Sequence, residues 1–519
     1  MKALPLLSAA LLALAPLDAQ TRSRARPVVG INLAGPADWN TEMPFEDMFR
    51  FSRPWVSQRP GAAWGKGPAL ELDERGWVRR LEEGCFAESP VCTVHGGHYP
   101  VGRYTLRFDG KGRLDLSNGG AVQRKGRGHL SVEVGSAARS MMLRLRETDP
   151  EDPVRNIRLL IPGADGRAKT SPFRADFLER WAGFASIRFM DWMETNNSEI
   201  RAWADRPTLE DATWSKQGVP VEVMVDLANR LQAEPWFCMP HQADDDYVRR
   251  FAQAVKAGLD RRLRVHVEYS NELWNGLFAQ ARYAQAQGLE AGLADKAWVA
   301  GWRYTAQRSV EIFDIWEDVF GGTKRLVRVL ATQAVNPFVS EQILTHEDAY
   351  RSADVLAVAP YISLNAGPRS DPSAADVAGW DLDRLFAHVD ARSLPKATTA
   401  MRKQKEVADR YGLGLVAYEA GQHLVGIGSG QNNAQVEALF KAANADPRME
   451  QVYDRYHAAW SEAGGGLMCH FSSVTAWSKY GSWGLLQYAD DDPAASPKLR
   501  AVRSWARAQG QKVAKRRRR

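Results

Sequence analysis

The feature that most constrains the fold is a regular alternation of short apolar runs and amphipathic stretches from residue 173 onward. The runs are rich in β-branched and aromatic residues, which is typical of buried strands, and the stretches between them have the apolar spacing of helices. Together with an earlier run at residues 28–33, this gives eight strands alternating with helices, which predicts a (β/α)8 TIM barrel rather than an open doubly wound sheet. The predicted strands cover residues 28–33, 185–190, 236–239, 264–269, 325–331, 355–359, 413–418 and 466–471.

No glycine-rich phosphate loop follows any of these strands, which argues against a dinucleotide-binding fold. The clearest helical stretches between them are residues 244–259, 277–320 and 399–411.

Between the first two predicted strands the pattern changes to short alternating segments separated by Gly, Asp and Asn turns. Such segments are typical of a small antiparallel sheet or sandwich, and they lie at residues 102–108, 129–134, 140–146 and 157–161. We therefore expect an all-β, sandwich-like module at 64–165, inserted after the first barrel strand. The barrel itself would then comprise residues 28–63 and 166–507.

The N-terminus has the composition of a secretory signal peptide. A lysine at position 2 precedes an apolar run at 3–17 and a small residue, Ala19, near a plausible cleavage point. We expect a signal peptide at 1–19 and a linker at 20–27, and hence a secreted or periplasmic protein. An uncleaved anchor is the alternative, although no later stretch is long and apolar enough to span a bilayer.

The C-terminus, residues 508–519, is predicted to be a disordered basic tail. Its six positive charges account for the net charge of +6, so the body is near neutral and has no basic stripe with interleaved aromatics. Nucleic-acid binding is therefore not expected.

The four cysteines have no metal-ligand spacing. Cys85 and Cys92 flank a short segment and could close a disulfide loop. Cys238 and Cys469 lie in strand-like runs, and we expect them to be buried thiols.

The candidate chemistry lies where the predicted strands end, because active sites of such barrels gather at the C-terminal ends of the strands. The fourth strand is followed by Asn271 and Glu272, and the seventh by Glu419. A carboxylate at the end of a buried strand destabilises the fold unless it is paired or solvated, or it is retained because it serves a function. For either glutamate alone, a structural role is a reasonable alternative. Opposite strands of a narrow barrel can, however, bring two carboxyls to the separation of about 5 Å that a double-displacement glycosidase needs.

In these residues the chain resembles clan A of the retaining glycoside hydrolases, which are (β/α)8 barrels with Asn-Glu after strand four and Glu after strand seven. The resemblance covers residues 28–60 and 170–505 and excludes the inserted module. It implies that Glu272 is the general acid/base and Glu419 the nucleophile. It also implies that Asn271 binds the sugar 2-hydroxyl and that Arg188 keeps the nucleophile ionised.

The resemblance also implies supporting aromatic residues. Tyr361 corresponds to the group that orients the nucleophile, and Trp477 to the strand-eight tryptophan that floors the sugar subsite. Further candidates for substrate contacts are His241 and, with less weight, Trp39, Asp191, Trp192, Trp274 and Trp483. The 18 tryptophans of the chain fit stacking on sugar rings, although aromatic residues at barrel rims also simply pack. We expect Glu268, inside the fourth strand, to be salt-bridged.

The leading hypothesis is a secreted retaining glycosidase that acts on a β-linked poly- or oligosaccharide, without cofactor or metal, as a monomer. A non-catalytic carbohydrate-binding or surface protein on the same scaffold is the alternative, because fold does not determine function. A metal-dependent barrel hydrolase using His241 and the three aspartates at 244–246 is less favoured. Consecutive residues do not share one helix face, and these aspartates suit a helix start.

Overall fold

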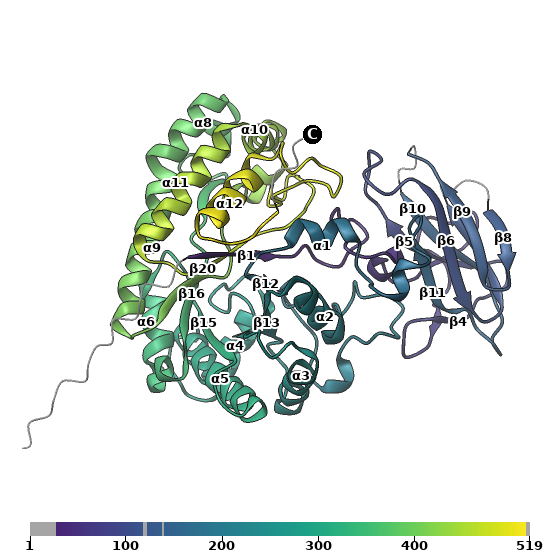
Figure 1. Cartoon of the computed structure of the whole chain (residues 1–519), viewed down its shortest axis with the longest axis horizontal. Helices are drawn as coiled ribbons and strands as arrows, with labels where there is room; N and C mark the ends of the chain where they lie inside the picture. The colour runs from purple at the N-terminus through teal and green to yellow at the C-terminus, as the bar shows by residue number, and fades with distance from the viewer. Residues whose placement is uncertain (1–26, 118–121, 137–139, 515–519) are drawn as a thin grey trace, which may run out of the picture.

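The computed structural model describes residues 27–117, 122–136 and 140–514 (Figure 1). Eight parallel strands form a closed barrel, and β1 pairs with both β12 and β20 to complete it. In barrel order they are β1 (Val28–Asn32), β12 (Ser186–Arg188), β13 (Glu234–Met239), β14 (Val265–Tyr269), β15 (Leu326–Ala331), β16 (Val355–Val358), β18 (Gly414–Ala417) and β20 (Leu467–His470). The predicted TIM barrel is confirmed, whereas the predicted signal peptide lies outside the described residues.

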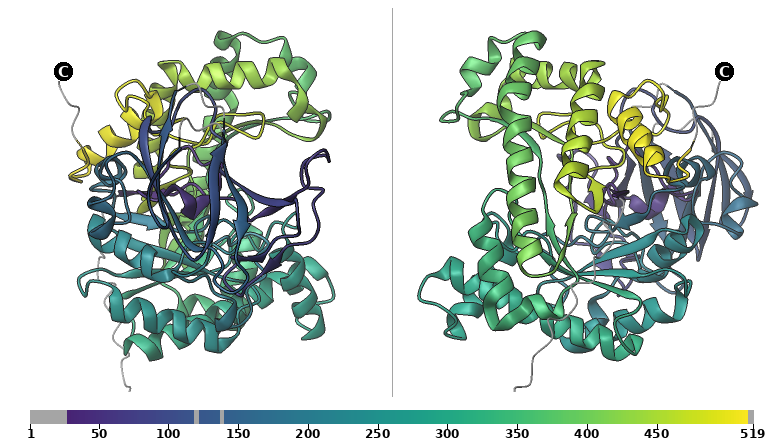
Figure 2. Two further views of the ribbon diagram at one scale, coloured as in Figure 1. Left: turned by 90° about the vertical axis from the view of Figure 1, so that its right-hand side faces the viewer. Right: turned by 60° about the vertical axis from the view of Figure 1, so that its left-hand side comes forward.

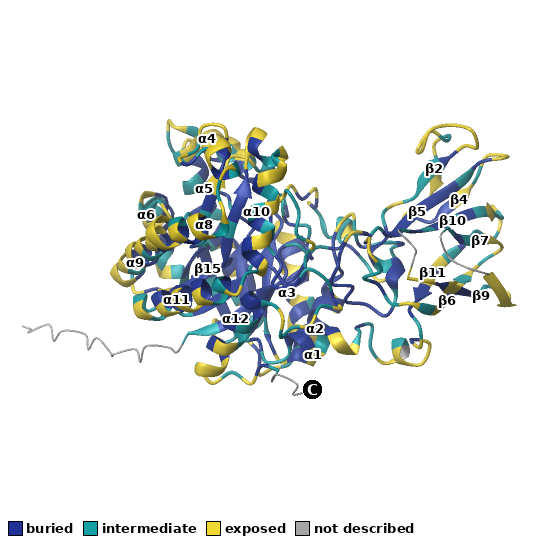
Figure 3. Cartoon of the chain, turned by 90° about the horizontal axis from the view of Figure 1, so that it is seen from above, coloured by how far each residue is buried: buried dark blue, intermediate teal, exposed yellow. Residues whose placement is uncertain are grey.

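The helices lie around the barrel, with exposed outer faces and buried faces toward the sheet (Figures 2 and 3). The predicted helix at 244–259 is α3, whose N-terminus is capped by Asp244, the side chain of which accepts from the Tyr247 amide. The predicted stretch 277–320 is divided into α4 and α5. The helices are α1 (Ala175–Trp181), α2 (Val221–Leu231), α3 (Asp245–Gly258), α4 (Ala279–Glu290), α5 (Ala297–Phe320), α6 (Pro337–Thr345), α7 (Ala374–Ala378), α8 (Leu382–His388), α9 (Leu394–Arg410), α10 (Ala434–Ala445), α11 (Arg448–Ala463) and α12 (Pro497–Ala508). None of the helices within the described ranges is long and apolar enough to cross a membrane.

Side chains alternate along each barrel strand, so one set packs against the helices and the other fills the barrel interior. The interior set includes Trp236, Cys238, Tyr418 and Cys469. A Cβ at Gly30 would lie 2.6 Å from the Cys469 Sγ, so only glycine fits there without rearrangement. The two strand cysteines are buried thiols, as predicted.

The inserted module consists of two four-stranded antiparallel sheets, seen at the right of Figure 1. One sheet has the order β2-β5-β10-β7 and the other β11-β6-β9-β8. The strands are β2 (Val56–Gln58), β5 (Phe86–Cys92), β6 (Gly102–Asp109), β7 (Gly112–Ser117), β8 (Val122–Gly126), β9 (His129–Val134), β10 (Met141–Thr148) and β11 (Arg155–Leu160), with the short hairpin β3 (Glu71–Leu72) and β4 (Val78–Arg80) beside them. Because β2 pairs with β5, the module begins before the predicted boundary at residue 64.

The thiols of Cys85 and Cys92 are both buried and free, so the disulfide considered from their spacing is not formed. Cys92 is the last residue of β5 and packs in the apolar core of the module.

Module and barrel are joined by packing and by polar contacts. Phe45, in the segment that leads into the module, packs against Phe173, in the segment that leaves it, at 5.5 Å between ring centroids. The imidazole of His98 stacks on Tyr488 of the barrel at 3.6 Å, and its Nδ1 lies 2.9 Å from Asp490.

Residues 508–514 of the predicted C-terminal tail contact the barrel, whereas residues 515–519 lie outside the described residues. The Gln511 side chain pairs with the backbone of Val29, at 2.6 Å from the amide and 3.1 Å to the carbonyl, and Val513 is buried. These contacts hold the segment against the N-terminal end of β1. The arginines at 516–519 lie outside the described residues.

Candidate active site

Both candidate glutamates stand just beyond the C-terminal ends of their strands. Glu419 follows β18, and Glu272 follows β14 in a segment where Ser270 and Glu272 have φ values of 54° and 44°. Left-handed backbone at residues other than glycine is costly and persists only where surrounding contacts impose it. The strained segment is therefore held by the side-chain network around it.

The Glu419 carboxylate is buried and accepts two hydrogen bonds. Arg188 Nη1 donates to its Oε1 at 3.0 Å, and the Tyr361 hydroxyl donates to its Oε2 at 2.9 Å. Tyr361 lies between β16 and the short strand β17 (Ile362–Ala366), which pairs in parallel with β19 (Gln422–Gly426) above the barrel. A guanidinium and a phenol thus converge on one carboxylate as hydrogen-bond donors, and the bond from the guanidinium is charge-assisted.

Arg188 is completely buried at the end of β12, and each of its five N–H groups has an acceptor. On the interior side, Nε and Nη2 donate to Glu268 at 3.1 and 2.9 Å. Nη2 also donates to Asn271 Oδ1 at 2.9 Å, and Nη1 is shared by Glu419 and Asn32 Oδ1. The predicted salt bridge of Glu268 is confirmed, whereas sequence reasoning missed Asn32, a polar residue that ends the first strand.

Glu272 has a different environment. The Asn275 amide donates to its Oε2 at 2.9 Å, and the Tyr418 hydroxyl donates to its Oε1 at 3.2 Å. Burial, and then the negative charge of Glu419, raise the pKa of Glu272 to about 7. One carboxyl of the pair can therefore carry a proton near neutral pH while the other is held by a cation.

Asn271 belongs to a chain of amides that fixes its orientation. Its Oδ1 accepts from Arg188, and its Nδ2 donates to Asn196 Oδ1 at 3.0 Å. Gln280, on α4, donates both to Asn196 at 2.7 Å and to the Asn271 carbonyl at 2.9 Å. These contacts fix both the side chain and the backbone of Asn271. Asn196 and Gln280 have no recognisable signal in the sequence, because they meet only through the fold.

An acidic pair lies close to this centre. Burial and the charge of Glu419 raise the pKa of Asp191, which follows β12, to about 7. Burial and the charge of Asp191 raise the pKa of Glu194 to about 8. Asp191 was only a weak candidate from sequence, and Glu194 was not recognised.

The two strand-eight tryptophans lie in different places. The Trp483 ring is 6.1 Å from the Tyr361 ring and 4.8 Å from His423, so it belongs to the aromatic cluster beside the nucleophile candidate. Trp477 instead donates to the Gly484 carbonyl, and Lys498 Nζ, whose pKa is lowered well below its ordinary value by burial, lies over its ring at 4.7 Å. The subsite role predicted for Trp477 stays a prediction, and by contact Trp483 is the better candidate.

The other predicted residues have different surroundings, and Trp192 is fully buried in the main core, where it donates to the Ala34 carbonyl. His241, just beyond β13, is buried against Tyr283, and burial lowers its pKa to about 4, so its imidazole is neutral. Trp274 is half-buried and packs on the main core. Trp39 is 63% exposed over Arg53, which makes it available for stacking.

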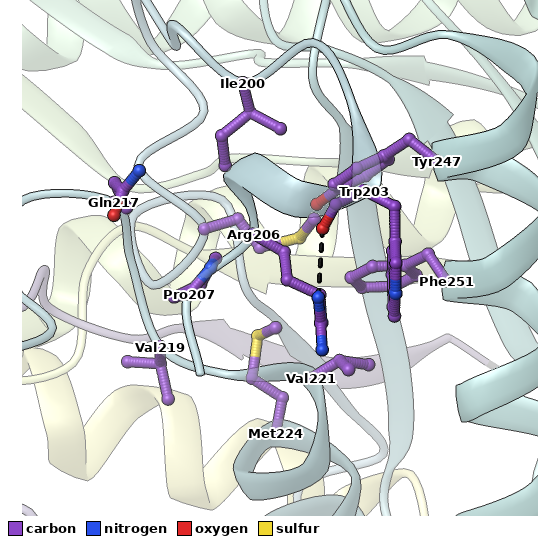
Figure 4. A pocket seen from close by; sticks show the side chains of 11 residues that line it. Ile200, Trp203, Arg206, Pro207, Gln217, Val219, Val221, Met224, Tyr247 and Phe251 are labelled. Atoms are coloured by element: carbon purple, nitrogen blue, oxygen red, sulfur yellow. Dashed lines mark hydrogen bonds between the residues drawn. The ribbon is translucent and has the colours of Figure 1, made fainter. Parts of the chain in front are cut away.

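A small cavity elsewhere in the barrel domain is not the site. It lies between the loop after β12 and helices α2 and α3, is lined mainly by apolar side chains such as Met224 and Phe251, and has room for about one water (Figure 4). Its one charged lining residue, Arg206, donates to the Trp203 carbonyl. Across residues 27–117, 122–136 and 140–514, no group of three or more His, Cys, Asp or Glu side chains is arranged to hold a metal ion.

Comparison with known proteins gives structural similarity only. No protein-family model and no curated protein matches the sequence. Among solved structures, a fungal β-1,4-galactanase aligns with 62% of this chain and 98% of its own, at 12% identity and TM-score 0.28. A Cellulomonas fimi endo-β-1,4-mannanase aligns with 55% of this chain and 57% of its own, at 13% identity and TM-score 0.29. A broad-specificity endoglucanase from Clostridum cellulovorans aligns with 66% of this chain and 90% of its own, at 10% identity and TM-score 0.35. At these scores the alignments carry no argument about function.

Proposed function

We propose that the chain is a retaining glycosidase that hydrolyses a β-linked poly- or oligosaccharide by double displacement. The observation that carries the proposal is the contrast between two neighbouring carboxyls at strand ends. Glu419 accepts from Arg188 and Tyr361, whereas the pKa of Glu272 is raised to about 7. Environments that separate the pKa values of paired carboxyls assign the roles of acid and nucleophile.

In the first step a Glu419 oxygen attacks the anomeric carbon, the glycosidic C–O bond breaks, and the Glu272 proton passes to the leaving oxygen. In the second step Glu272 takes a proton from water, the water oxygen bonds to the anomeric carbon, and the ester to Glu419 breaks. Asn271 donates its remaining N–H to the sugar 2-hydroxyl, and Trp483 stacks on the ring. The composition of residues 1–19 supports export of the enzyme.

The test is hydrolysis of β-glucan, mannan, xylan and galactan polymers and of aryl β-glycosides by wild type and Glu419→Gln. We expect wild type to cleave at least one substrate with retained anomeric configuration and the variant to lose this activity. Turnover by the variant at the wild-type rate would exclude the mechanism. Binding of a polymer without any hydrolysis by wild type would favour a non-catalytic carbohydrate-binding protein.

A further inference from the structure

Glu268 is a carboxylate enclosed in the barrel interior and is only 1% exposed. Its Oε2 accepts from Arg188, from Trp236 Nε1 at 2.8 Å and from Cys238 Sγ at 3.4 Å. Every one of these partners is a donor. Burial raises the pKa of this carboxyl, whereas the Arg188 guanidinium and the N–H and S–H donors replace its hydration and favour its charged form.

The guanidinium of Arg188 is shared by two carboxylates on opposite sides. Nε and Nη2 face Glu268 in the interior, and Nη1 faces Glu419 in the site at 3.0 Å. A single positive charge thus serves two negative charges. Removing one of them would leave the other with the whole attraction of the cation, since burial makes such interactions strong.

Building on the function proposed above, we propose that Glu268 is a positioning residue that fixes the Arg188 guanidinium and divides its charge. The division keeps Glu419 ionised but leaves it electron-rich enough to attack. A carboxylate that alone received the full charge of a buried arginine would be stabilised as an anion and would be a weaker nucleophile. Glu268 itself touches no substrate and acts only through Arg188.

The other titratable groups around this pair do not supply the same charge. The groups that face Glu419 or Glu268 are Arg188, Tyr361, Tyr418, Cys238, Cys469, Asp191 and Glu272. Burial raises the pKa of both tyrosines and both cysteines well into the alkaline range, so they are neutral. The pKa values of Asp191 and Glu272 are about 7, so both are mostly protonated under mildly acidic conditions.

The experiment compares wild type with Glu268→Gln, which removes the charge, and Glu268→Asp, which keeps it on a shorter side chain. Glu222→Gln, at an exposed position on α2, is the matched control. Two quantities are measured: the pH profile of kcat/KM on an aryl β-glycoside that wild type accepts, and the carbon-13 NMR titration of glutamate side chains. The Glu419 signal is assigned by its loss in Glu419→Gln.

In Glu268→Gln we expect the acid limb of the profile and the midpoint of the Glu419 signal to move to lower pH by about one unit. We also expect kcat to fall with little change in KM. In Glu268→Asp the acid limb of the pH profile should lie at its wild-type position, because the charge is kept. The kcat should still be reduced, because the shorter aspartate side chain displaces Arg188. An unmoved limb and midpoint in Glu268→Gln, with only a lower Tm, would overturn the proposal and leave Glu268 a purely structural residue.

Glu268→Gln leaves a buried arginine short of a counter-charge and can fail to fold. In that case the kcat of Glu268→Asp is the test. A reduced kcat supports the proposal, and a kcat equal to that of wild type would overturn it. If wild type hydrolyses no glycoside, the proposed glycosidase function fails. The NMR titration, which needs no turnover, then decides whether Glu268 controls the charge on Glu419.

Discussion

Replacing Glu272 with glutamine should make the protein more stable at alkaline pH while removing its proton donor. In the folded protein the pKa of Glu272 is raised from its ordinary value of 4.5 to about 7. Ionising this buried carboxyl therefore costs about 3 kcal/mol more in the folded than in the unfolded chain. Below pH 4.5 both states are protonated and the cost is absent. It grows between the two pKa values and is complete above pH 7.

Glu272→Gln removes this cost, so we expect a gain in unfolding free energy of up to about 3 kcal/mol at pH 8 and close to none at pH 4. Urea denaturation of wild type, Glu272→Gln and the exposed control Glu222→Gln at both pH values measures the difference. Part of the cost comes from the charge of Glu419, so the gain should be smaller in a Glu419→Gln background. An equal gain at pH 4 and pH 8, or none at either, would refute the assignment of Glu272 as the protonated carboxyl.

Three further predictions concern single contacts. Tyr361→Phe removes the hydroxyl that donates at 2.9 Å to the nucleophile candidate, so kcat on an aryl glycoside should fall while the Tm changes little; an unchanged kcat would deny the tyrosine this role. Trp483→Ala should raise KM for oligosaccharides more than Trp477→Ala, because only Trp483 belongs to the aromatic cluster at the site; the reverse order in steady-state kinetics would contradict this. Gly30→Ala should lower the unfolding free energy by about 1–3 kcal/mol, since its Cβ would lie 2.6 Å from Cys469 Sγ. Urea denaturation measures this change, and an unchanged midpoint would show that the interior accommodates the methyl group.

Much of the chain's organisation could be predicted from local patterns. Strand and helix periodicity is a property of consecutive residues, so the eight strands and the inserted β module were identified without tertiary information. The strand-end glutamates followed because barrel topology places strand ends together. The start of the module could not be derived in this way, because β2 belongs to the module through its pairing with β5.

Composition did not reveal the contacts of residues 511–513 in the C-terminal segment. Its basic residues predicted a disordered tail, but Gln511 pairs with the first barrel strand and Val513 is buried. Those contacts involve residues almost the whole chain away, and no local pattern encodes them. The free thiols of Cys85 and Cys92 likewise follow from the geometry of the module. Their spacing in the sequence is compatible with a disulfide, but whether the bond forms depends on the distance and orientation of the two side chains.

By itself the sequence determined the barrel, the module and the two carboxyls, because each depends on periodicity or on position at a strand end. The tertiary structure alone decided how those carboxyls differ. Arg188 and Tyr361 converge on Glu419 from other strands, and burial beside that charge raises the pKa of Glu272 to about 7. A pKa depends on distance, burial and neighbouring charge in space, and none of these can be derived from the order of residues alone.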